Sequence, residues 1–323
     1  MPTPRTAAVV YNPIKVEVDD LRAAVAAEPG AAGWDVMWLE TSEEDPGQGQ
    51  ATEALAKGAT VVIAVGGDGT VRTVSEVVRT SKDAAVALLP SGTGNLLARN
   101  LDLTLDDMAH SIRTAFTGTI REVDVARIEI RRADRSTDEH AFLVMAGAGL
   151  DAKIMSNTDP ELKKKVGWLA YAQALGVALR DKDALRVGYQ LDAGRRHTER
   201  AQAIIVGNCG SLPANILLLP DAAVDDGLLD IVVLKPESIR GWLGVVFKVF
   251  WENGIVRRTP LGKRLSGVEI ASMDYRRGKN LEVRLSKPEE IELDGDPFGA
   301  TTGFTVTVEP GALRIMVPSE EAA

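Results

Sequence analysis

The chain has 323 residues, of which 45% are hydrophobic and 26% charged, and its formal net charge is −9. This composition is globular, and the length allows two domains. The acidic balance argues against a protein that coats nucleic acid, because such binding depends on Lys and Arg contacts to phosphates. No run of about 18 uncharged apolar residues and no signal-peptide pattern occurs, so we expect a soluble, cytoplasmic protein. The single cysteine, Cys209, excludes an intramolecular disulfide and is expected to be a buried apolar thiol.

The N-terminal part of the chain alternates short apolar runs with amphipathic ones. We expect strands at 6–12, 34–41, 60–65 and 84–90, and helices at 19–28, 49–59, 71–81 and 95–101. Strands separated by helices of this length predict a parallel sheet with crossover helices. We therefore expect a doubly wound α/β domain over residues 1–123.

After this domain, the pattern of apolar and polar residues changes to that of alternating strands with turn signals between them. The expected strands lie within 125–132, 140–147, 185–208, 228–235, 281–287, 290–295 and 303–318. This pattern predicts an antiparallel sandwich or barrel, interrupted by helices near 160–180 and 236–257. We expect a β-sandwich domain over residues 124–311, with a tail at about 312–323 that could pack back on the first domain.

The turn after the third strand, "GGDGT" at 66–70, has the composition of a phosphate-binding loop. Gly66, Gly67 and Gly69 would allow positive φ and leave no Cβ between backbone N–H groups and an anion. The following helix start adds partial positive charge. Asp68 would repel a phosphate unless a cation or a transferable proton lies between them, which suggests a Mg²⁺-nucleotide.

Two established phosphate fingerprints do not fit the sequence. A Walker motif needs G-x-x-x-x-G-K-[ST], which is not found. In "GDGTVR" Arg72 stands where the dinucleotide fingerprint needs its third glycine. "GAGLDA" at 147–152 matches that fingerprint, but residues 162–180 carry no Asp or Glu where a ribose-binding acid is expected, so we take it as a chance match.

A second glycine-containing turn follows the next strand, in "PSGTGN" at 90–95. Two such turns on neighbouring parallel strands would converge on one crevice at the carboxyl ends of the strands. Together they are more specific than either turn alone.

These motifs resemble the diacylglycerol kinase catalytic domain family, which includes bacterial soluble lipid kinases and the sphingosine and ceramide kinases. The resemblance rests on "GGDGT" and "PSGTGNLLAR", and extends over nearly the whole chain. Further matching stretches are "YNP" at 11–13, Thr41, "GAGLDA" at 147–152, "VGN" at 206–208, "PDAAVDDGLLDIVVL" at 220–234 and "DGD" at 294–296.

The resemblance implies an N-terminal nucleotide domain like that of NAD kinases and 6-phosphofructokinases, a C-terminal β-sandwich lipid domain, and transfer of the ATP γ-phosphate to a lipid hydroxyl. The nucleotide site implied by the family pattern and the second turn comprises Asn12, Thr41, Gly66, Gly67, Asp68, Gly69, Thr70, Gly92, Thr93 and Asn95. A structural Mg²⁺ would be held by the Asp226 carboxylate and the carbonyls of Ala223 and Leu228. Without the resemblance, that segment would be read as a hairpin turn.

Two positions depart from the family pattern. Bacterial relatives usually carry Asp-Gly-Glu near the C-terminus, with Glu as the general base, and the matching residue here is Asp296. Asp can accept the same proton, but its side chain is one carbon shorter, so either Asp296 or Asp68 is the catalytic base. Asp294 is either a helper or a turn former. Lys15 lies where many relatives have a Ser-Gly pair, and its role is open.

The resemblance favours an ATP-dependent kinase of diacylglycerol in phospholipid metabolism, at the inner membrane face. Alternatives are a kinase of another lipid such as a sphingoid base, an NAD kinase, which "DDGLLD" and "PSGTGN" disfavour, and a nucleotide-binding regulator without turnover.

A lipid substrate implies transient peripheral membrane contact. The segments at 239–258 and 163–180 have aromatic residues suited to an interface, but core packing is the preferred interpretation. Sandwich edge strands could form a homodimer.

Overall fold

The computed structural model describes residues 5–149, 185–212, 216–235 and 273–319, in two compact units. The first unit comprises Met1–Val125, Val224–Gly227 and Glu309–Ala323. The second comprises Ala126–Ala223 and Leu228–Val308. The segments predicted as interfacial or core helices, at 163–180 and 239–258, lie outside the described residues. Within the described part, no helix is long and apolar enough to span a bilayer.

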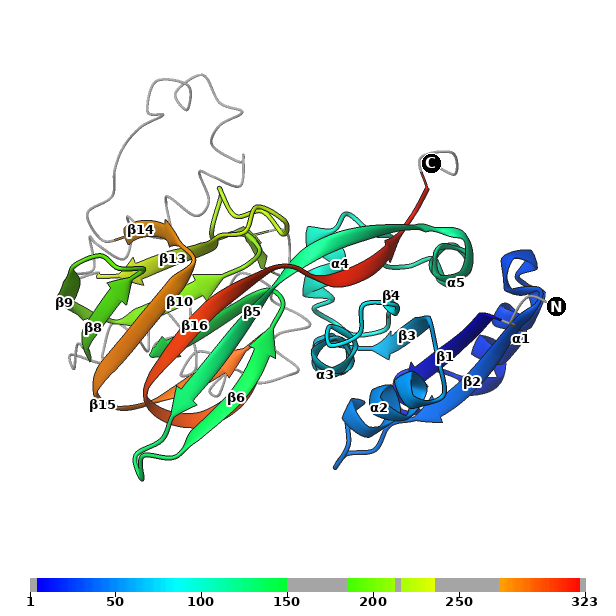
Figure 1. Cartoon of the computed structure of the whole chain (residues 1–323), viewed down its shortest axis with the longest axis horizontal. Helices are drawn as coiled ribbons and strands as arrows, with labels where there is room; N and C mark the ends of the chain where they lie inside the picture. The colour runs from blue at the N-terminus through cyan, green and yellow to red at the C-terminus, as the bar shows by residue number, and fades with distance from the viewer. Residues whose placement is uncertain (1–4, 150–184, 213–215, 236–272, 320–323) are drawn as a thin grey trace, which may run out of the picture. The chain divides into compact units, whose positions relative to one another are not determined.

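The first unit is an α/β layer built on a parallel sheet (Figure 1). Its strands are β1 (Arg5–Tyr11), β2 (Trp34–Glu40), β3 (Val61–Gly66) and β4 (Ala85–Pro90), in the spatial order β2-β1-β3-β4. Its helices are α1 (Val18–Ala27), the 3₁₀ turn η1 (Pro29–Ala31), α2 (Gln48–Ala56), α3 (Asp68–Val78), α4 (Leu96–Asn100) and α5 (Met108–Thr117). The predicted doubly wound sheet is confirmed, whereas α5 was not predicted.

Both faces of this sheet are covered, which explains why its strands read as continuous apolar runs. Alternate residues of β1, β3 and β4 pack against α1 and α5, where Leu21 and Ile112 are fully buried. Helices α2 and α3 cover the opposite face. Gly47, at the start of α2, lies close to Val10 of β1 and to Val74 of α3, so the two helices and the sheet meet there. Helices on both faces leave the carboxyl ends of the strands as the open edge.

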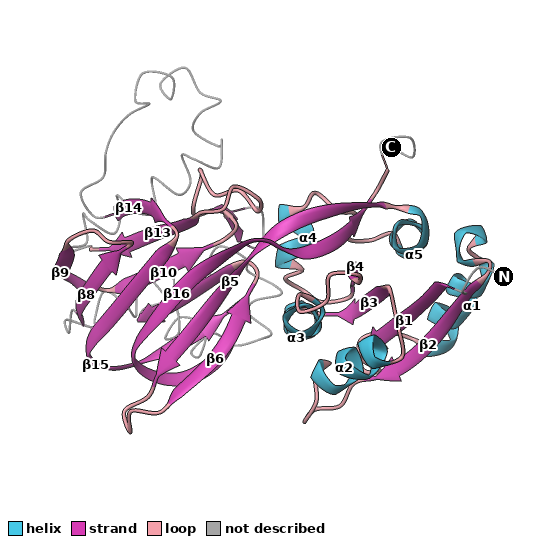
Figure 2. Cartoon of the chain, in the orientation of Figure 1, coloured by secondary structure: helices cyan, strands magenta, loops and turns pink. Residues whose placement is uncertain are grey.

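The second unit consists mainly of antiparallel strands (Figure 2). They are β5 (Thr119–Arg131), β6 (Thr137–Phe142), β7 (Met145–Gly149), β8 (Leu185–Leu191), β9 (Arg196–Ala201), β10 (Ala203–Gly207), β11 (Ser211–Leu212), β12 (Ile216–Leu217), β13 (Leu229–Leu234), β14 (Met273–Gly278), β15 (Asn280–Leu293) and β16 (Asp296–Val317). The ends of β5 and β16 belong to the first unit. The predicted sandwich is confirmed, but β14 was not predicted.

Strand β15 joins two groups of strands around one core. Its residues 281–285 pair with β8 and its residues 291–293 pair with β7, with register shifts between the two parts. The bulge lets one strand bend and contribute to both layers, so 281–287 and 290–295 are one strand rather than two. Phe142, Tyr189 and Phe304 lie in the single apolar cluster that results.

Candidate functional site

The carboxyl ends of four parallel strands meet at one edge of the first unit. Thr41 N–H donates to the last carbonyl of β1 at 2.9 Å, and Asn12 N–H donates to a carbonyl near the end of β3 at 3.1 Å. Ser91 N–H donates to the last carbonyl of β3 at 3.0 Å. These bonds bring the loops after β1, β2, β3 and β4 together, as the sequence predicted for the two glycine-rich turns.

The two glycine-rich turns touch each other through their backbones. A Cβ on Gly92 would lie 2.6 Å from the Cα of Gly67, closer than side chains approach a backbone carbon. A Cβ on Gly66 would lie 2.7 Å from Thr70. Glycine is therefore required at Gly92 and Gly66, because a Cβ would collide there with neighbouring protein atoms. The reason expected from the sequence, room for an anion at the backbone N–H groups, stays a prediction.

The other expected reason, positive φ, is wrong for these glycines. Gly67 has φ −89°, and Gly66, Gly69, Gly92 and Gly94 are likewise not among the glycines with positive φ. The left-handed residue of the pair of turns is Asn95, with φ 48°. Its amide stabilises that conformation by bonding both ways to Gly92, accepting from its N–H and donating to its carbonyl, each at 3.0 Å.

Asp68 links the two turns through hydrogen bonds to the backbone. Its carboxylate accepts from Asn95 N–H at 2.9 Å and from Leu96 N–H at 2.5 Å. It thereby supplies an acceptor to the N-terminus of α4, where Asn95 makes no side-chain cap of its own. Its predicted position beside a Mg²⁺-nucleotide stays a prediction, but its structural role was missed by sequence reasoning.

The remaining predicted nucleotide residues differ in exposure. Thr41 is 4% exposed and Thr70 is 6% exposed, whereas Thr93 lies exposed in the second turn. Asn12 accepts from Ile14 N–H through its side-chain oxygen at 3.0 Å, so it shapes the loop that carries Lys15. Lys15 itself is exposed. The predicted residues therefore lie at one edge of the sheet, in the loops after β1, β2 and β4, at the end of β3 and in the first turn of α3.

The turn with Asp226 is held in place by a buried carboxylate that sequence reasoning missed. Asp124, only 2% exposed, accepts from Gly227 N–H at 2.6 Å and from Gly311 N–H at 2.8 Å, and its own N–H donates to Val224 at 2.7 Å. The available signal was an acidic residue inside the apolar run "VDVARI". A buried ion is costly unless hydrogen-bonded, so an isolated Asp in such a run indicates a structural bond.

The chemistry of this turn fits a hard cation. Among the described residues, no three carboxylate, imidazole or thiol groups come close enough to hold a metal ion. A cation at Asp226 would therefore need main-chain carbonyls, and Ala223 and Leu228 at the two sides of the turn would supply oxygens of the kind Mg²⁺ accepts. The neighbouring carboxylate, Asp225, is occupied by Arg121 at 2.7 Å.

The predicted base, Asp296, starts β16 directly after a tight turn. Asp294 and Gly295 form the two-residue connection, with φ 50° and 88°, as in a type I′ hairpin. The Asp294 carboxylate accepts from the N–H groups of Leu143, Val144 and Met145 at 2.9 to 3.0 Å. Asp294 is thus a buried turn former that fixes the position of the half-buried Asp296 on its strand.

A second buried side chain holds the same backbone segment. Asn208, from "VGN", donates from its side-chain amide to Leu143 O at 3.1 Å and from its backbone to Val144 O at 2.8 Å. Cys209 is a buried free thiol, as predicted. Gly147 and Gly149 lie within the antiparallel strand β7 and not after a parallel strand, which supports rejection of the dinucleotide motif.

Comparison with protein families gives two matches that together span most of the chain. The model of the diacylglycerol kinase catalytic domain matches residues 6–128. The model of the YegS C-terminal NAD kinase beta sandwich-like domain matches residues 144–317. The two matched regions correspond to an α/β part followed by a sandwich part.

Curated relatives and solved structures agree with these matches. A protein of Pseudomonas aeruginosa named "Probable lipid kinase YegS-like" is 31% identical over 305 residues, covering 93% of this chain and 90% of its own length. A diacylglycerol kinase from Bacillus anthracis strain Sterne superposes with a TM-score of 0.69 at 19% identity, over all of both chains. Yeast NADH kinase, solved with NADH, gives 0.51 at 10% identity, over 97% of this chain and 83% of its own. Both structures show the fold alone.

Proposed function

This chain belongs to the diacylglycerol kinase catalytic domain family, and from that premise we propose that it transfers the γ-phosphate of ATP to the hydroxyl of diacylglycerol, giving phosphatidic acid. The family and the curated relatives make it a lipid kinase; the choice of diacylglycerol is the finer step. The observation that carries the proposal is the backbone contact between Gly67 and Gly92, bridged by the Asp68 carboxylate.

That contact supports nucleotide binding for a physical reason. Phosphoryl transfer needs little covalent chemistry from the protein and depends on positioning and on neutralising charge. Two glycine turns fixed to each other give rigid backbone N–H donors next to the N-terminus of α3, which favours anions. In our proposal, the nucleotide phosphates lie on this backbone, with Asn12, Thr41 and Thr93 around them.

The proposed reaction assigns the proton to a carboxylate. The lipid hydroxyl oxygen attacks the γ-phosphorus, the bond from that phosphorus to the β–γ bridging oxygen breaks, and ADP leaves. Asp296 accepts the hydroxyl proton, with Asp68 as the alternative acceptor. When bound, Mg²⁺ neutralises phosphate charge, and a structural Mg²⁺ at Asp226 with the carbonyls of Ala223 and Leu228 would stabilise the turn.

The proposed substrate also determines the location that we propose for the protein. Diacylglycerol resides in the bilayer, so the kinase would work in the cytoplasm with transient contact at the inner membrane face. A homodimer through sandwich edge strands stays a prediction.

The test is a radiolabelled-ATP assay with diacylglycerol, sphingosine and NAD as acceptors. We expect labelled phosphatidic acid from the wild type and a loss of about 10²- to 10⁴-fold in Asp296→Asn, the usual range for a general base. Labelled sphingosine phosphate or NADP instead would reassign the substrate. Nucleotide binding without any labelled product would show a regulator and contradict the proposal.

Gly67→Ala tests the cradle separately from the fold. A Cβ on Gly67 would lie 3.6 Å from the nearest atom, an ordinary contact, and its φ of −89° suits alanine. We therefore expect unchanged thermal stability but a nucleotide affinity lower by about tenfold or more, as for one lost hydrogen bond to a charged group. Unchanged ATP affinity by calorimetry would contradict phosphate binding on this backbone.

A further inference from the structure

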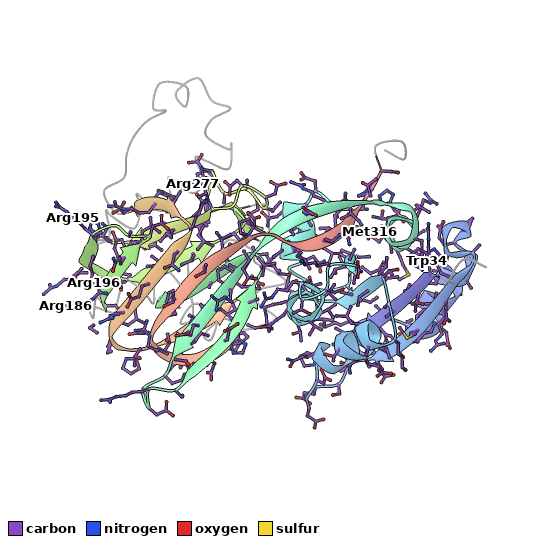
Figure 3. The ribbon with its side chains drawn as sticks, viewed as in Figure 1. Trp34, Arg186, Arg195, Arg196, Arg277 and Met316 are labelled. Carbon is purple, nitrogen blue, oxygen red and sulfur yellow. The ribbon has the colours of Figure 1, made fainter. Side chains whose placement is uncertain are left out.

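One surface of the second unit has a charge opposite to that of the whole chain. Along β8, Leu185, Val187 and Tyr189 are buried in the core, so the residues between them face outward. The outward residues of β8 and of the adjoining strands β9 and β15 form a continuous sheet face. Figure 3 labels Arg186, Arg195 and Arg196, whose side chains project outward from the β8–β9 hairpin.

The strand register collects arginines on this face. Arg186 of β8 lies directly opposite Arg200 of β9, and Arg196 lies opposite Gln190. On the other side of β8, Arg284 of β15 lies opposite Gly188. We call these four residues the arginine face: Arg186, Arg196, Arg200 and Arg284. All four are exposed.

Among the outward-facing residues that pair with β8, one carries a negative charge, Glu282. Glu282 lies 2.8 Å from Arg284, 3.2 Å from Arg196 and 3.9 Å from Arg131. The hydrogen bond from Arg284 holds the pKa of Glu282 below its ordinary value, so this carboxylate is ionised at neutral pH. One negative charge shared by three arginines leaves the surface positive.

Two members of the face have no carboxylate partner in the described part of the chain. Arg186 and Arg200 make no ion pair there, although they are cross-strand neighbours. Like charges directly opposite each other destabilise a sheet. Although the chain has a net charge of −9, no carboxylate of the described residues pairs with these two arginines, which leaves both available to an external anion.

The shape of the face limits the kind of anion. Between the arginines lie short side chains: Gly188 on β8 and Thr198, its cross-strand neighbour, on β9. The guanidinium groups therefore come from three adjacent strands of one sheet face, with short side chains between them. Guanidinium forks bind phosphate oxygens in pairs, so separated forks on a sheet suit a plane of phosphate groups better than one small ligand.

We propose that the arginine face docks the protein on the anionic surface of a phospholipid bilayer. The proposal rests on the lipid substrate proposed above, because that substrate supplies the reason for bilayer contact. Anionic headgroups attract basic residues by an amount equal to about a fivefold change in binding for each charge. The attraction acts only within a Debye length, so it favours reversible contact.

The experiment measures sedimentation of the full chain with sucrose-loaded vesicles, made of phosphatidylcholine alone or with about 30% phosphatidylglycerol. We expect wild type to bind the phosphatidylglycerol vesicles, and R186Q/R200Q to bind them about 25-fold more weakly, from two lost charges. The control K57Q/K82Q removes two charges from exposed lysines of the first unit and should bind within about twofold of wild type. Raising the salt from about 0.1 M to about 1 M should release the wild type.

Three results would overturn the proposal: equal binding to both kinds of vesicle, equal loss in both double variants, or tighter arginine-dependent binding to a short DNA duplex than to vesicles. Activity in neutral detergent micelles with diacylglycerol separates this question from the function. R186Q/R200Q should keep the wild-type rate in micelles and lose it on anionic vesicles. If the wild type phosphorylates no lipid in micelles, the proposed function fails, while vesicle sedimentation still decides the arginine face.

Discussion

The Asp68 carboxylate has a structural role at the start of α4, and we propose a role in phosphoryl transfer beside it. Asp68→Asn should lower the free energy of unfolding by about 1–2 kcal/mol, because the carboxamide offers one acceptor oxygen to two N–H groups at the start of α4. It should also slow transfer more than it weakens ATP binding, as expected if a cation or a transferred proton lies between Asp68 and the nucleotide phosphates. Urea unfolding, ATP titration and the labelled-phosphate assay measure the three effects.

A second helix cap in the same unit provides the matched control. Asp107 accepts from His110 N–H at 2.9 Å at the start of α5. Asp107→Asn should cost a similar stability, about 1 kcal/mol, and leave transfer unchanged. If both variants lost transfer equally, the effect of Asp68→Asn would be attributed to stability alone.

Gly92 gives a purely steric prediction. Gly92→Ala places a Cβ 2.6 Å from a backbone Cα, which cannot rotate away as a side chain could. The two turns would separate, with an expected loss of about 1–3 kcal/mol of stability and loss of ATP binding. Thermal unfolding beside Gly67→Ala, which has ordinary contacts, checks this; equal stability of the two variants would contradict the described contact.

The sequence was sufficient to predict that these glycines lie in two neighbouring turns. It was not sufficient to predict the structural reason why glycine is needed there. Positive φ and missing Cβ are both properties of glycine, and only the distance between two turns from different crossovers decides between them. Asp124 and Asp294 are similar cases. Their carboxylates bond to N–H groups more than 100 residues away in sequence, at Gly227 and at Leu143, which no local pattern contains.

At the level of single elements, the turn with Asp226 predicts a metal-dependent stability. If it holds Mg²⁺, the melting temperature of the wild type should rise with Mg²⁺ concentration, by the equivalent of about 2.7 kcal/mol at 100 times the dissociation constant. Asp226→Asn should abolish the rise. Asp225→Asn, which removes the neighbouring carboxylate paired with Arg121, should keep it. A rise that survives in Asp226→Asn would place the metal elsewhere.

The strands β9, β13 and β14 share a charge network with a defined pH dependence. Lys235 contacts Glu199 and lies 3.2 Å from Asp274, which also receives a bond from Arg276. Burial raises the pKa of Asp274, but the bonds from Arg276 and Lys235 outweigh it and hold that pKa below its ordinary value. The network therefore adds stability above the ordinary pKa of Asp, which is lost as the pH falls through the lowered value.

Lys235→Met tests this network. It should lower the free energy of unfolding by about 1–3 kcal/mol between about pH 5 and pH 8, and the difference from wild type should shrink below about pH 4. Lys57→Met is the control, because Lys57 pairs with Glu53 at 2.5 Å and both side chains are exposed. A difference that grew in acid would contradict the role of Asp274.

Element types were predicted best where the period was clear. The parallel strands β1 to β4 of the first unit follow the predicted ranges to within a residue at each end. In the second unit, the single strand predicted within 140–147 is wrong, because it divides into β6 and β7, and β16 begins well before its predicted start. Helix α5, "MAHSIRTAFT", was missed because no strong start signal precedes it apart from Asp107. Strand β14, "MDYRRG", was missed because its polar residues are paired with neighbours such as Asp230 and Lys235, so polarity there does not indicate a loop.

On the scale of the whole molecule, the last strand completes a sheet that begins with the first residues. Within the described residues, Ile315 of β16 pairs in parallel with Val86 of β4, while the earlier part of β16 pairs with β15. Leu313 and Ile315 are fully buried, and Met316 joins the core of the first unit. Sequence order alone could only suggest a returning tail, because the pairing partner lies far back in the chain.

This return makes the N-terminal sheet dependent on the C-terminus. Deleting residues 312–323 removes three buried apolar side chains, each worth about 2–5 kcal/mol when truncated, which together approach the whole stability of a domain. We expect amides of β1, β3 and β4 to lose protection in hydrogen exchange, while β8 and β10 keep theirs. Deleting 320–323 removes none of these side chains and should change neither. If β3 and β4 kept their protection after the longer deletion, the N-terminal sheet would be stable without β16. The C-terminal part of β16 would then contribute nothing to the folding of the first unit.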